Sequence, residues 1–165
     1  MGFMYSVKDF LGIGRGKIKL QLSKINFSPG EAVTGNVILS LKEPVQAEEL
    51  SVDVNGILIV TQNVTRQVQG RTVTRPQSVN YPLFNFKLRL DGEKVYPQGE
   101  NAASYPFSIT IPADVYAKNS TDGAGTFQKI MQSLSKQYQR TDWRVQARLS
   151  VKGIDTTDVV QINVA

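Results

Sequence analysis

The fold is decided by one stretch of the chain, Phe27-Ser28-Pro29-Gly30-Glu31-Ala32-Val33-Thr34-Gly35-Asn36-Val37. Its Pro-Gly pair predicts a turn, because proline fixes φ and glycine tolerates a positive φ. The apolar residues after the turn recur at odd positions, namely Val33, Val37, Leu39 and Leu41. This period of two predicts an extended strand that buries one face and exposes the other.

The same alternation recurs along most of the chain, in segments separated by turn signals such as Asp91-Gly92 and Lys152-Gly153. These segments are residues 18–22, 50–60, 84–90, 105–111, 143–151 and 160–164. One buried face per strand is typical of antiparallel sheets packed face to face. Turns at this spacing favour a sandwich over a βαβ fold.

Two of these segments, and also residues 64–75, carry further expectations. The side chains expected on the buried faces include Trp143 and the group Phe84, Phe86, Leu88 and Leu90. Residues 64–75 alternate polar and β-branched side chains around Gly70, which predicts a polar hairpin.

Two segments follow a helical period instead. Apolar residues at helical spacing precede Gly12, and they are Phe3, Met4, Val7, Phe10 and Leu11. They predict a short amphipathic helix and a glycine hinge over residues 1–15, and we expect this helix to dock on its own or a neighbouring chain's sandwich. A second helical pattern, Phe127, Ile130, Met131, Leu134 and Tyr138, predicts a helical insertion within a long loop at residues 112–141.

The composition is that of a globular chain, with 165 residues, 41% hydrophobic residues and 20% charged residues. This length suits one core, so we expect residues 1–165 to form a single domain. No run approaches the ~18 consecutive apolar residues of a membrane span, and the start lacks the pattern of a signal peptide. We therefore expect a cytoplasmic protein.

The residue types that most enzymes use are missing from the chain. It has no cysteine and no histidine, which excludes disulfides and thiolate catalysis and removes the commonest general base and metal ligand. The glycine-rich residues 12–17 lack the spacing of a phosphate loop, and the paired carboxylates lie at predicted turns, where they stay solvated. We expect no enzymatic activity, no cofactor and no metal site.

Several blocks, taken in chain order, resemble the arrestin-like sandwich domains. They are Gly16 to Phe27, Pro29-Gly30-Glu31 with Gly35-Asn36-Val37, Glu43 to Gly56, Ser104 to Pro112, and Trp143 to Val151. Within that group the chain is similar to the sporulation-control protein family, through its amphipathic start, Gly12-Ile13-Gly14 and Gly153-Ile154-Asp155. The resemblance implies an all-β, antiparallel, immunoglobulin-like sandwich and the function of a non-enzymatic adaptor or regulatory scaffold.

One charge asymmetry is present within a net charge of +5. No acidic residue occurs between Asp53 and Asp91, whereas five basic residues do, and they are Arg66, Arg71, Arg75, Lys87 and Arg89. Arginine forks suit carboxylates and phosphates, so these side chains form a candidate anion-binding or partner-binding face if the hairpin folds over a sheet. The alternative is a solvated strand face whose charges oppose edge-to-edge aggregation.

Two functions are open at this level. The first is a protein-binding adaptor that recognises a partner by a sheet edge or by the basic face. The alternative is a peripheral membrane-surface module anchored by the N-terminal amphipathic helix. The partners that the pattern admits are an acidic or phosphorylated protein, a membrane surface and a second copy of the chain, and nucleic acid is not expected.

Overall fold

The computed structural model describes residues 16–117, 139–153 and 155–165. These residues form strands and contain no helix. The strands are β1 (Gly16–Leu22), β2 (Asn26–Phe27), β3 (Ala32–Leu41), β4 (Val45–Ala47), β5 (Glu49–Val68), β6 (Arg71–Asp91), β7 (Lys94–Tyr96), β8 (Gly99–Thr110), β9 (Gln139–Ser150) and β10 (Thr156–Val164). The helix predicted at residues 1–15 lies outside the described residues, as do residues 118–138 of the insertion predicted at 112–141.

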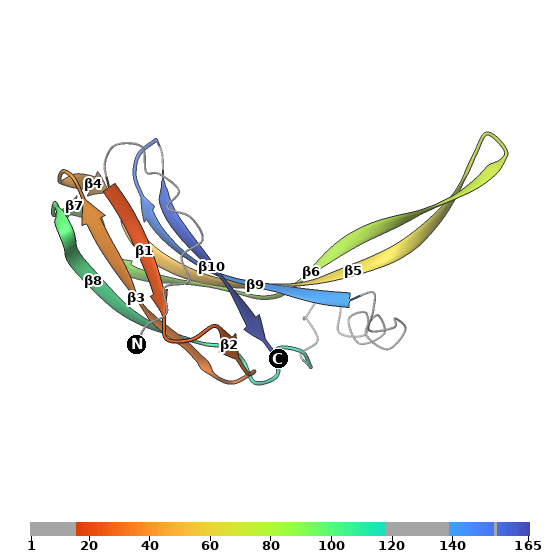
Figure 1. The fold of residues 1–165 in the computed structure, drawn as a ribbon, viewed down its shortest axis with the longest axis horizontal. Coiled ribbons are helices and arrows are strands. Elements are labelled where there is room, and N and C mark those ends of the chain that lie inside the picture. Colours follow the sequence, from red (N-terminus) through yellow and green to blue (C-terminus); the bar gives the residue numbers. More distant parts are fainter. Residues whose placement is uncertain (1–15, 118–138, 154) are drawn as a thin grey trace.

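The strands form two facing sheets and a small third one (Figure 1). The smaller facing sheet has the order β1-β3-β8, the larger one has the order β2-β10-β9-β5-β6, and β4 pairs with β7. All pairs are antiparallel except the short pair of β2 with β10, which is parallel. The predicted all-β class is confirmed, and the sheets are antiparallel apart from the β2–β10 pair.

The decisive stretch around Pro29 forms the centre of the smaller sheet. Glu31 N–H donates to Ser28 O at 3.0 Å and Gly30 has φ +93°, so Pro29-Gly30 occupies the corner of a type II turn. The turn leads into β3, which pairs with β1 on one side and β8 on the other. A period-two strand with partners on both sides has one face left to bury, and that face carries Val33, Val37 and Leu39.

The core lies between the two facing sheets and receives alternate side chains from both. Trp143 is its largest member and is 1% exposed, as the alternation of β9 predicts. Its indole lies over Gly56 on the neighbouring strand, where an added Cβ would come within 2.6 Å of the ring. The indole N–H donates to the Tyr116 hydroxyl at 3.1 Å, so the ring's polar atom is satisfied.

The apolar face of β6 is less buried than the sequence pattern predicts. Phe86 is 45% exposed, and Phe84, Leu88 and Leu90 are only partly buried. The reason is the sheet order, because β6 is the outermost strand of the larger sheet and the facing sheet is three strands wide. The prediction of a fully buried face here was wrong.

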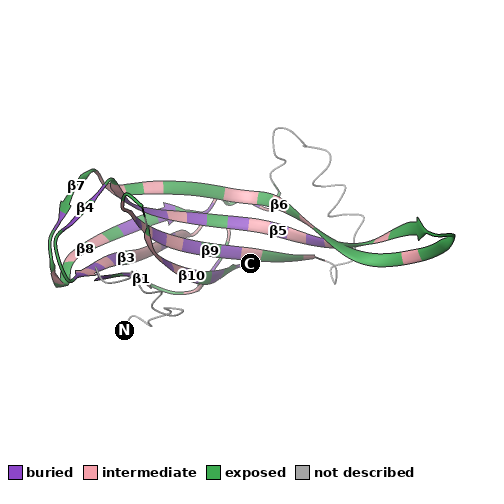
Figure 2. Cartoon of the chain, turned by 90° about the horizontal axis from the view of Figure 1, so that it is seen from above, coloured by how far each residue is buried: buried purple, intermediate pink, exposed green. Residues whose placement is uncertain are grey.

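Strands β5 and β6 are much longer than predicted. The described part of β9 begins at Gln139, which lies opposite Val60 of β5. Beyond Val60, β5 and β6 pair with no other described strand and form a two-stranded ribbon, residues 61–78, which we call the arm (Figures 1 and 2). The hairpin predicted at residues 64–75 is the outer part of this arm.

Candidate binding surfaces

The arm is a regular hairpin closed by a tight turn. Val68 lies opposite Arg71, and the two residues between them have positive φ, 52° at Gln69 and 77° at Gly70. Two consecutive residues with positive φ correspond to a type I′ turn, whose twist matches that of the flanking strands. The direction in which the arm leaves the sandwich is therefore set by paired strands and a short turn.

The base of the arm is held by a small apolar cluster separate from the main core. Leu58 and Val60 are buried, and Tyr81 and Leu83 pack against them. Further out, Figure 2 shows the arm as almost wholly exposed. The buried residues of this cluster thus lie where β5 still pairs with the described part of β9.

The two faces of the arm differ in chemistry. Residues that lie opposite each other share a face, and the register pairs Val64 with Arg75, Arg66 with Val73, and Val68 with Arg71. One face therefore alternates three arginines with three valines, and we call it the arginine–valine face. The other face carries Thr65 opposite Thr74 and Gln67 opposite Thr72, with no charge.

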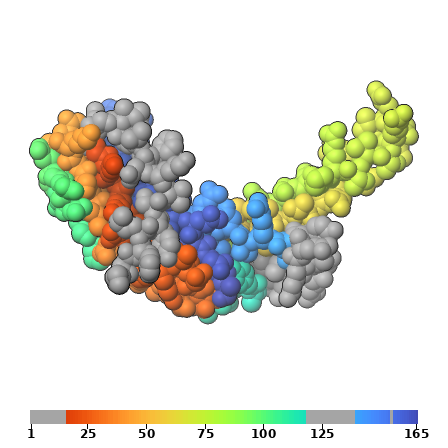
Figure 3. Space-filling model, viewed as in Figure 1, coloured from red at the N-terminus to blue at the C-terminus, as the bar shows by residue number. Residues whose placement is uncertain are grey.

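The arginine–valine face belongs to the arm, which projects away from the sandwich (Figure 3). Residues of this face, with Pro76 and Gln77, line a concavity of about 480 Å³. Val68 is 54% exposed, and all three arginines are exposed. None of Arg66, Arg71 and Arg75 has an ion-pair partner within the part of the chain that the structure describes.

The uncharged face supports the ribbon through side-chain hydrogen bonds. The Thr65 and Thr74 hydroxyls lie 3.3 Å apart, and those of Thr61 and Ser78 lie 3.4 Å apart. Cross-strand pairs of this kind contribute roughly 0.2–1 kcal/mol each. This face stabilises the hairpin and leaves the charged face free for a partner.

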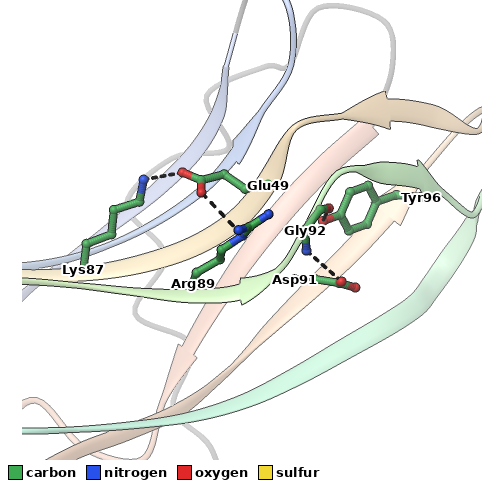
Figure 4. Close-up of polar contacts among 6 residues, drawn as sticks. All are labelled: Glu49, Lys87, Arg89, Asp91, Gly92 and Tyr96. Atoms are coloured by element: carbon green, nitrogen blue, oxygen red, sulfur yellow. Dashed lines mark hydrogen bonds and ion pairs between the residues drawn. The ribbon is translucent and has the colours of Figure 1, made fainter.

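The other two predicted cations lie elsewhere. Lys87 and Arg89 project from the outer face of the larger sheet, where both contact the carboxylate of Glu49 (Figure 4). The distance from Arg89 Nε to Glu49 Oε2 is 3.8 Å. The structure therefore brings together Arg66, Arg71 and Arg75 and separates them from Lys87 and Arg89.

This separation has a specific cause, a β-bulge in β6. Gly56 lies opposite Phe84 and Ile57 opposite Pro82, so Leu83 is the extra residue and the alternation of β6 changes phase there. Arg75 and Lys87 both have odd numbers, and uninterrupted alternation would place them on one face. Because of the bulge, they lie on opposite faces.

The outer face of the larger sheet has a second, smaller concavity of about 400 Å³. Its lining includes Asp53, Arg144 and Asp142, and Arg144 Nη2 donates to Asp142 Oδ2 at 2.8 Å. Burial raises the pKa of Asp53 above its usual value, and Arg148 opposes that rise. The Arg144–Asp142 ion pair thus neutralises two of the three charged side chains that line this concavity.

A carboxylate network joins the end of β6 to β7 and β8. Asp91 accepts a 2.8 Å hydrogen bond from the Gly92 N–H (Figure 4). It also accepts a 2.8 Å hydrogen bond from the Tyr105 hydroxyl and forms a 2.8 Å ion pair with Lys94. The bonds from Lys94 and Tyr105 lower the pKa of Asp91 to about 2. Burial raises the pKa of Tyr96 to about 12, and its hydroxyl donates to Gly92 O at 2.8 Å. These shifts have structural causes and accompany no free catalytic group.

One outermost strand of each facing sheet, β6 and β8, carries prolines. Pro76 and Pro82 lie on β6, and Pro106 lies on β8. Proline lacks an N–H, and within sheets it occurs where its nitrogen points away from the paired strand. Each proline therefore removes a donor from a free edge, which disfavours partner binding by strand addition there.

The proposed docking helix, Phe3, Met4, Val7, Phe10 and Leu11, lies outside the described residues. Among the residues that are described, no group of three or more acidic side chains is placed to hold a metal ion. The described part also contains no helix long and apolar enough to cross a membrane.

Comparison with known proteins places this fold in a family. The search of curated proteins finds no match. Among solved structures, sporulation control protein Spo0M from Bacillus subtilis is similar, with a TM-score of 0.50 and 20% sequence identity. The match covers 92% of this chain and 50% of that chain, so this chain spans half the length of that structure, and the likeness concerns the fold. The family model of the arrestin (or S-antigen) N-terminal domain matches residues 16–131 of this chain. The resemblance seen in the sequence is confirmed, and the chain belongs to the arrestin N-terminal domain family.

Proposed function

We propose that this protein is a non-enzymatic adaptor whose arm binds an acidic or phosphorylated protein partner through the arginine–valine face. The observation that carries this proposal is the gathering of three unpaired arginines and three valines on one face of a projecting ribbon. Arginine forks bind carboxylates and phosphates with two hydrogen bonds each, and the adjacent valines add apolar contact.

The spacing of the arginines defines what kind of segment fits. Arg66 is diagonal to both Arg71 and Arg75 across the ribbon, which corresponds to a separation of roughly 7–8 Å between neighbours. An extended peptide advances about 3.4 Å per residue, so its alternate side chains lie about 7 Å apart. A segment with acidic groups on alternate residues therefore matches the three arginines in register.

Two further observations favour this surface over the others. The prolines on β6 and β8 disfavour strand addition at those two sheet edges. Lys87 and Arg89 contact Glu49, so part of their charge is already used. Of the predicted partner-binding surfaces we therefore keep the basic face, and we restrict it to Arg66, Arg71 and Arg75.

The test is a binding titration with a fluorescent nine-residue peptide that alternates Glu and Val, and with a second peptide carrying phosphoserine in place of Glu. We expect both to bind the intact chain, and we expect the triple variant R66A/R71A/R75A to weaken binding at least tenfold. The difference between the two peptides distinguishes carboxylate from phosphate as the preferred group.

The matched control is K87A/R89A/R144A, which removes three cations from the outer face of the larger sheet and should change the affinity less than twofold. Equal loss in both variants would show a non-specific effect of net charge and contradict the proposal. Flotation with anionic vesicles in the absence of peptide binding would instead favour a membrane-surface function.

A further inference from the structure

The end of the sandwich farthest from the arm has the opposite charge. Strands β4 and β7 form this end, and Figure 1 shows them across the molecule from the tip of the arm. Residues 42–49 and 91–100 together contain six carboxylates and two lysines, a net charge of −4. The arm contains three arginines and no carboxylate, a net charge of +3.

Part of this negative charge is free to bind. Glu49 contacts Lys87 and Arg89, and Asp91 contacts Lys94. Glu48, Glu93 and Glu100 are exposed, and none has an ion-pair partner among the described residues. We call these three residues with Val95 the acidic end.

An exposed apolar residue lies beside two of these carboxylates. Val95 is 57% exposed and lies opposite Gln46 on the outward face of the β4–β7 pair. Glu48 follows β4 directly and Glu93 precedes β7 directly, so the register brings both to the same end of the pair, two residues from Gln46 and Val95. The acidic end thus offers an exposed valine next to carboxylates, and the arm offers valines next to arginines.

The arm and the acidic end cannot meet within one chain, because they lie at opposite ends of the molecule (Figure 1). A two-stranded ribbon with no packed face is marginally stable in water, so a covering surface stabilises it. A second molecule can supply the covering surface that the arm's own chain cannot.

We propose that the arm of one copy docks on the acidic end of a second copy, and that the chain assembles head to tail. This proposal rests on the proposed function and names a partner for the same face. A contact between two different surfaces leaves one free arm and one free acidic end at every step, so it propagates into a chain or closes into a ring. The assembly is a scaffold that displays repeated sandwich domains.

The first experiment measures the mass of the full chain by analytical ultracentrifugation over rising protein concentration in low salt. We expect the mass to rise with concentration above the 18.3 kDa of one copy. We expect about 0.5 M salt to return the protein to one copy, because screening shortens the reach of the charges to a few ångströms. The variants R66A/R71A/R75A and E48Q/E93Q/E100Q should each remain single copies.

Mixing these two variants gives the sharper result. The first retains the acidic end and the second retains the arm, so the mixture has one working contact and no way to propagate. We expect complexes of two copies and nothing larger.

A single chain that carries both R66E/R71E/R75E and E48K/E93K/E100K restores the complementarity with inverted signs and should assemble again. K87A/R89A/R144A should assemble as the unmodified chain does.

Three results would overturn the proposal. They are a chain that stays a single copy at low salt up to about 1 mM, assembly that survives neutralisation of the acidic end, and a mixture that forms no paired complex. Measuring peptide binding shows whether such a result refutes only self-assembly or also the proposed adaptor function. A single-copy chain that still binds the acidic peptide through its arginines refutes self-assembly alone, whereas loss of both refutes both.

Discussion

Strands β5 and β6 run through two regions of the molecule that obey the same alternation and have opposite properties. In the sandwich, β5 lies between β9 and β6, and its inward side chains Val52, Val54 and Leu58 are buried. In the arm, the same face of the same strand carries Val64, Arg66 and Val68, which lie largely in solvent. Alternation alone therefore does not create a core, because a core also needs a facing layer and a third strand.

This comparison predicts a steep difference in the cost of substitutions along the two strands. Changes in the sandwich should alter the free energy of unfolding, and changes in the arm should alter binding. The following predictions test that division, from the largest expected effect to the smallest.

Replacing Trp143 tests the sandwich at its largest buried side chain. Trp143→Ala should lower the free energy of unfolding by about 3–5 kcal/mol, because it opens a cavity and leaves the Tyr116 hydroxyl without its donor. Urea unfolding followed by far-UV circular dichroism measures this. An unchanged unfolding midpoint would refute the burial of this face.

Replacing Gly56 tests the close contact beneath the same ring. Gly56→Ala places a Cβ within 2.6 Å of the Trp143 indole, and we expect a loss of about 1–3 kcal/mol from overpacking. Asn55→Ala, at the exposed neighbour, is the control and should change little.

The pair of changes at these positions sharpens the result. Adding Gly56→Ala to Trp143→Ala should cost much less than adding it to the unmodified chain, because the ring that it strikes is gone. Strictly additive losses would mean that the two residues do not contact each other.

Replacing Asp91 tests the network that joins β6 to β8. The folded pKa of Asp91 is about 2, below the usual 3.8, so its contribution to stability is present above about pH 4 and is lost as the pH falls through about 2. Asp91→Asn should cost about 1 kcal/mol at pH 7, after allowance for solvent screening, and should flatten the stability profile between pH 4 and 2. Glu93→Gln, on a nearby exposed carboxylate, should leave the profile unchanged.

Removing the arm tests the other side of the comparison. Gln62 lies opposite Gln77, so replacing residues 63–76 with Asn-Gly closes the shortened hairpin with a type I′ turn. We expect the free energy of unfolding of the sandwich to change by less than about 1 kcal/mol, while binding of the acidic peptide is lost. A large loss of stability would show that the arm belongs to the folding unit.

Much of the fold was predictable from the residues in order. The alternating segments, the Pro29-Gly30 turn and the burial of Trp143 are all confirmed, because each depends on local geometry and on which side chains avoid water. The candidate site was only partly predictable. The five cations were visible, but their division into two groups was not.

What the sequence by itself determined is the strand pattern, the turn positions, the family and the acid-free stretch between Asp53 and Asp91. The tertiary structure alone decided three things: β5 and β6 pair with each other as far as Val68 and Arg71, β6 lies at a sheet edge with Phe86 half exposed, and the bulge at Leu83 reverses the phase of β6. The physical reason is that alternation sets which side chains share a face within an unbroken strand, whereas neighbouring strands and bulges set whether that face is covered and where it points. That second kind of information placed Arg66, Arg71 and Arg75 together on one face of the arm and Lys87 and Arg89 on the opposite face of the larger sheet.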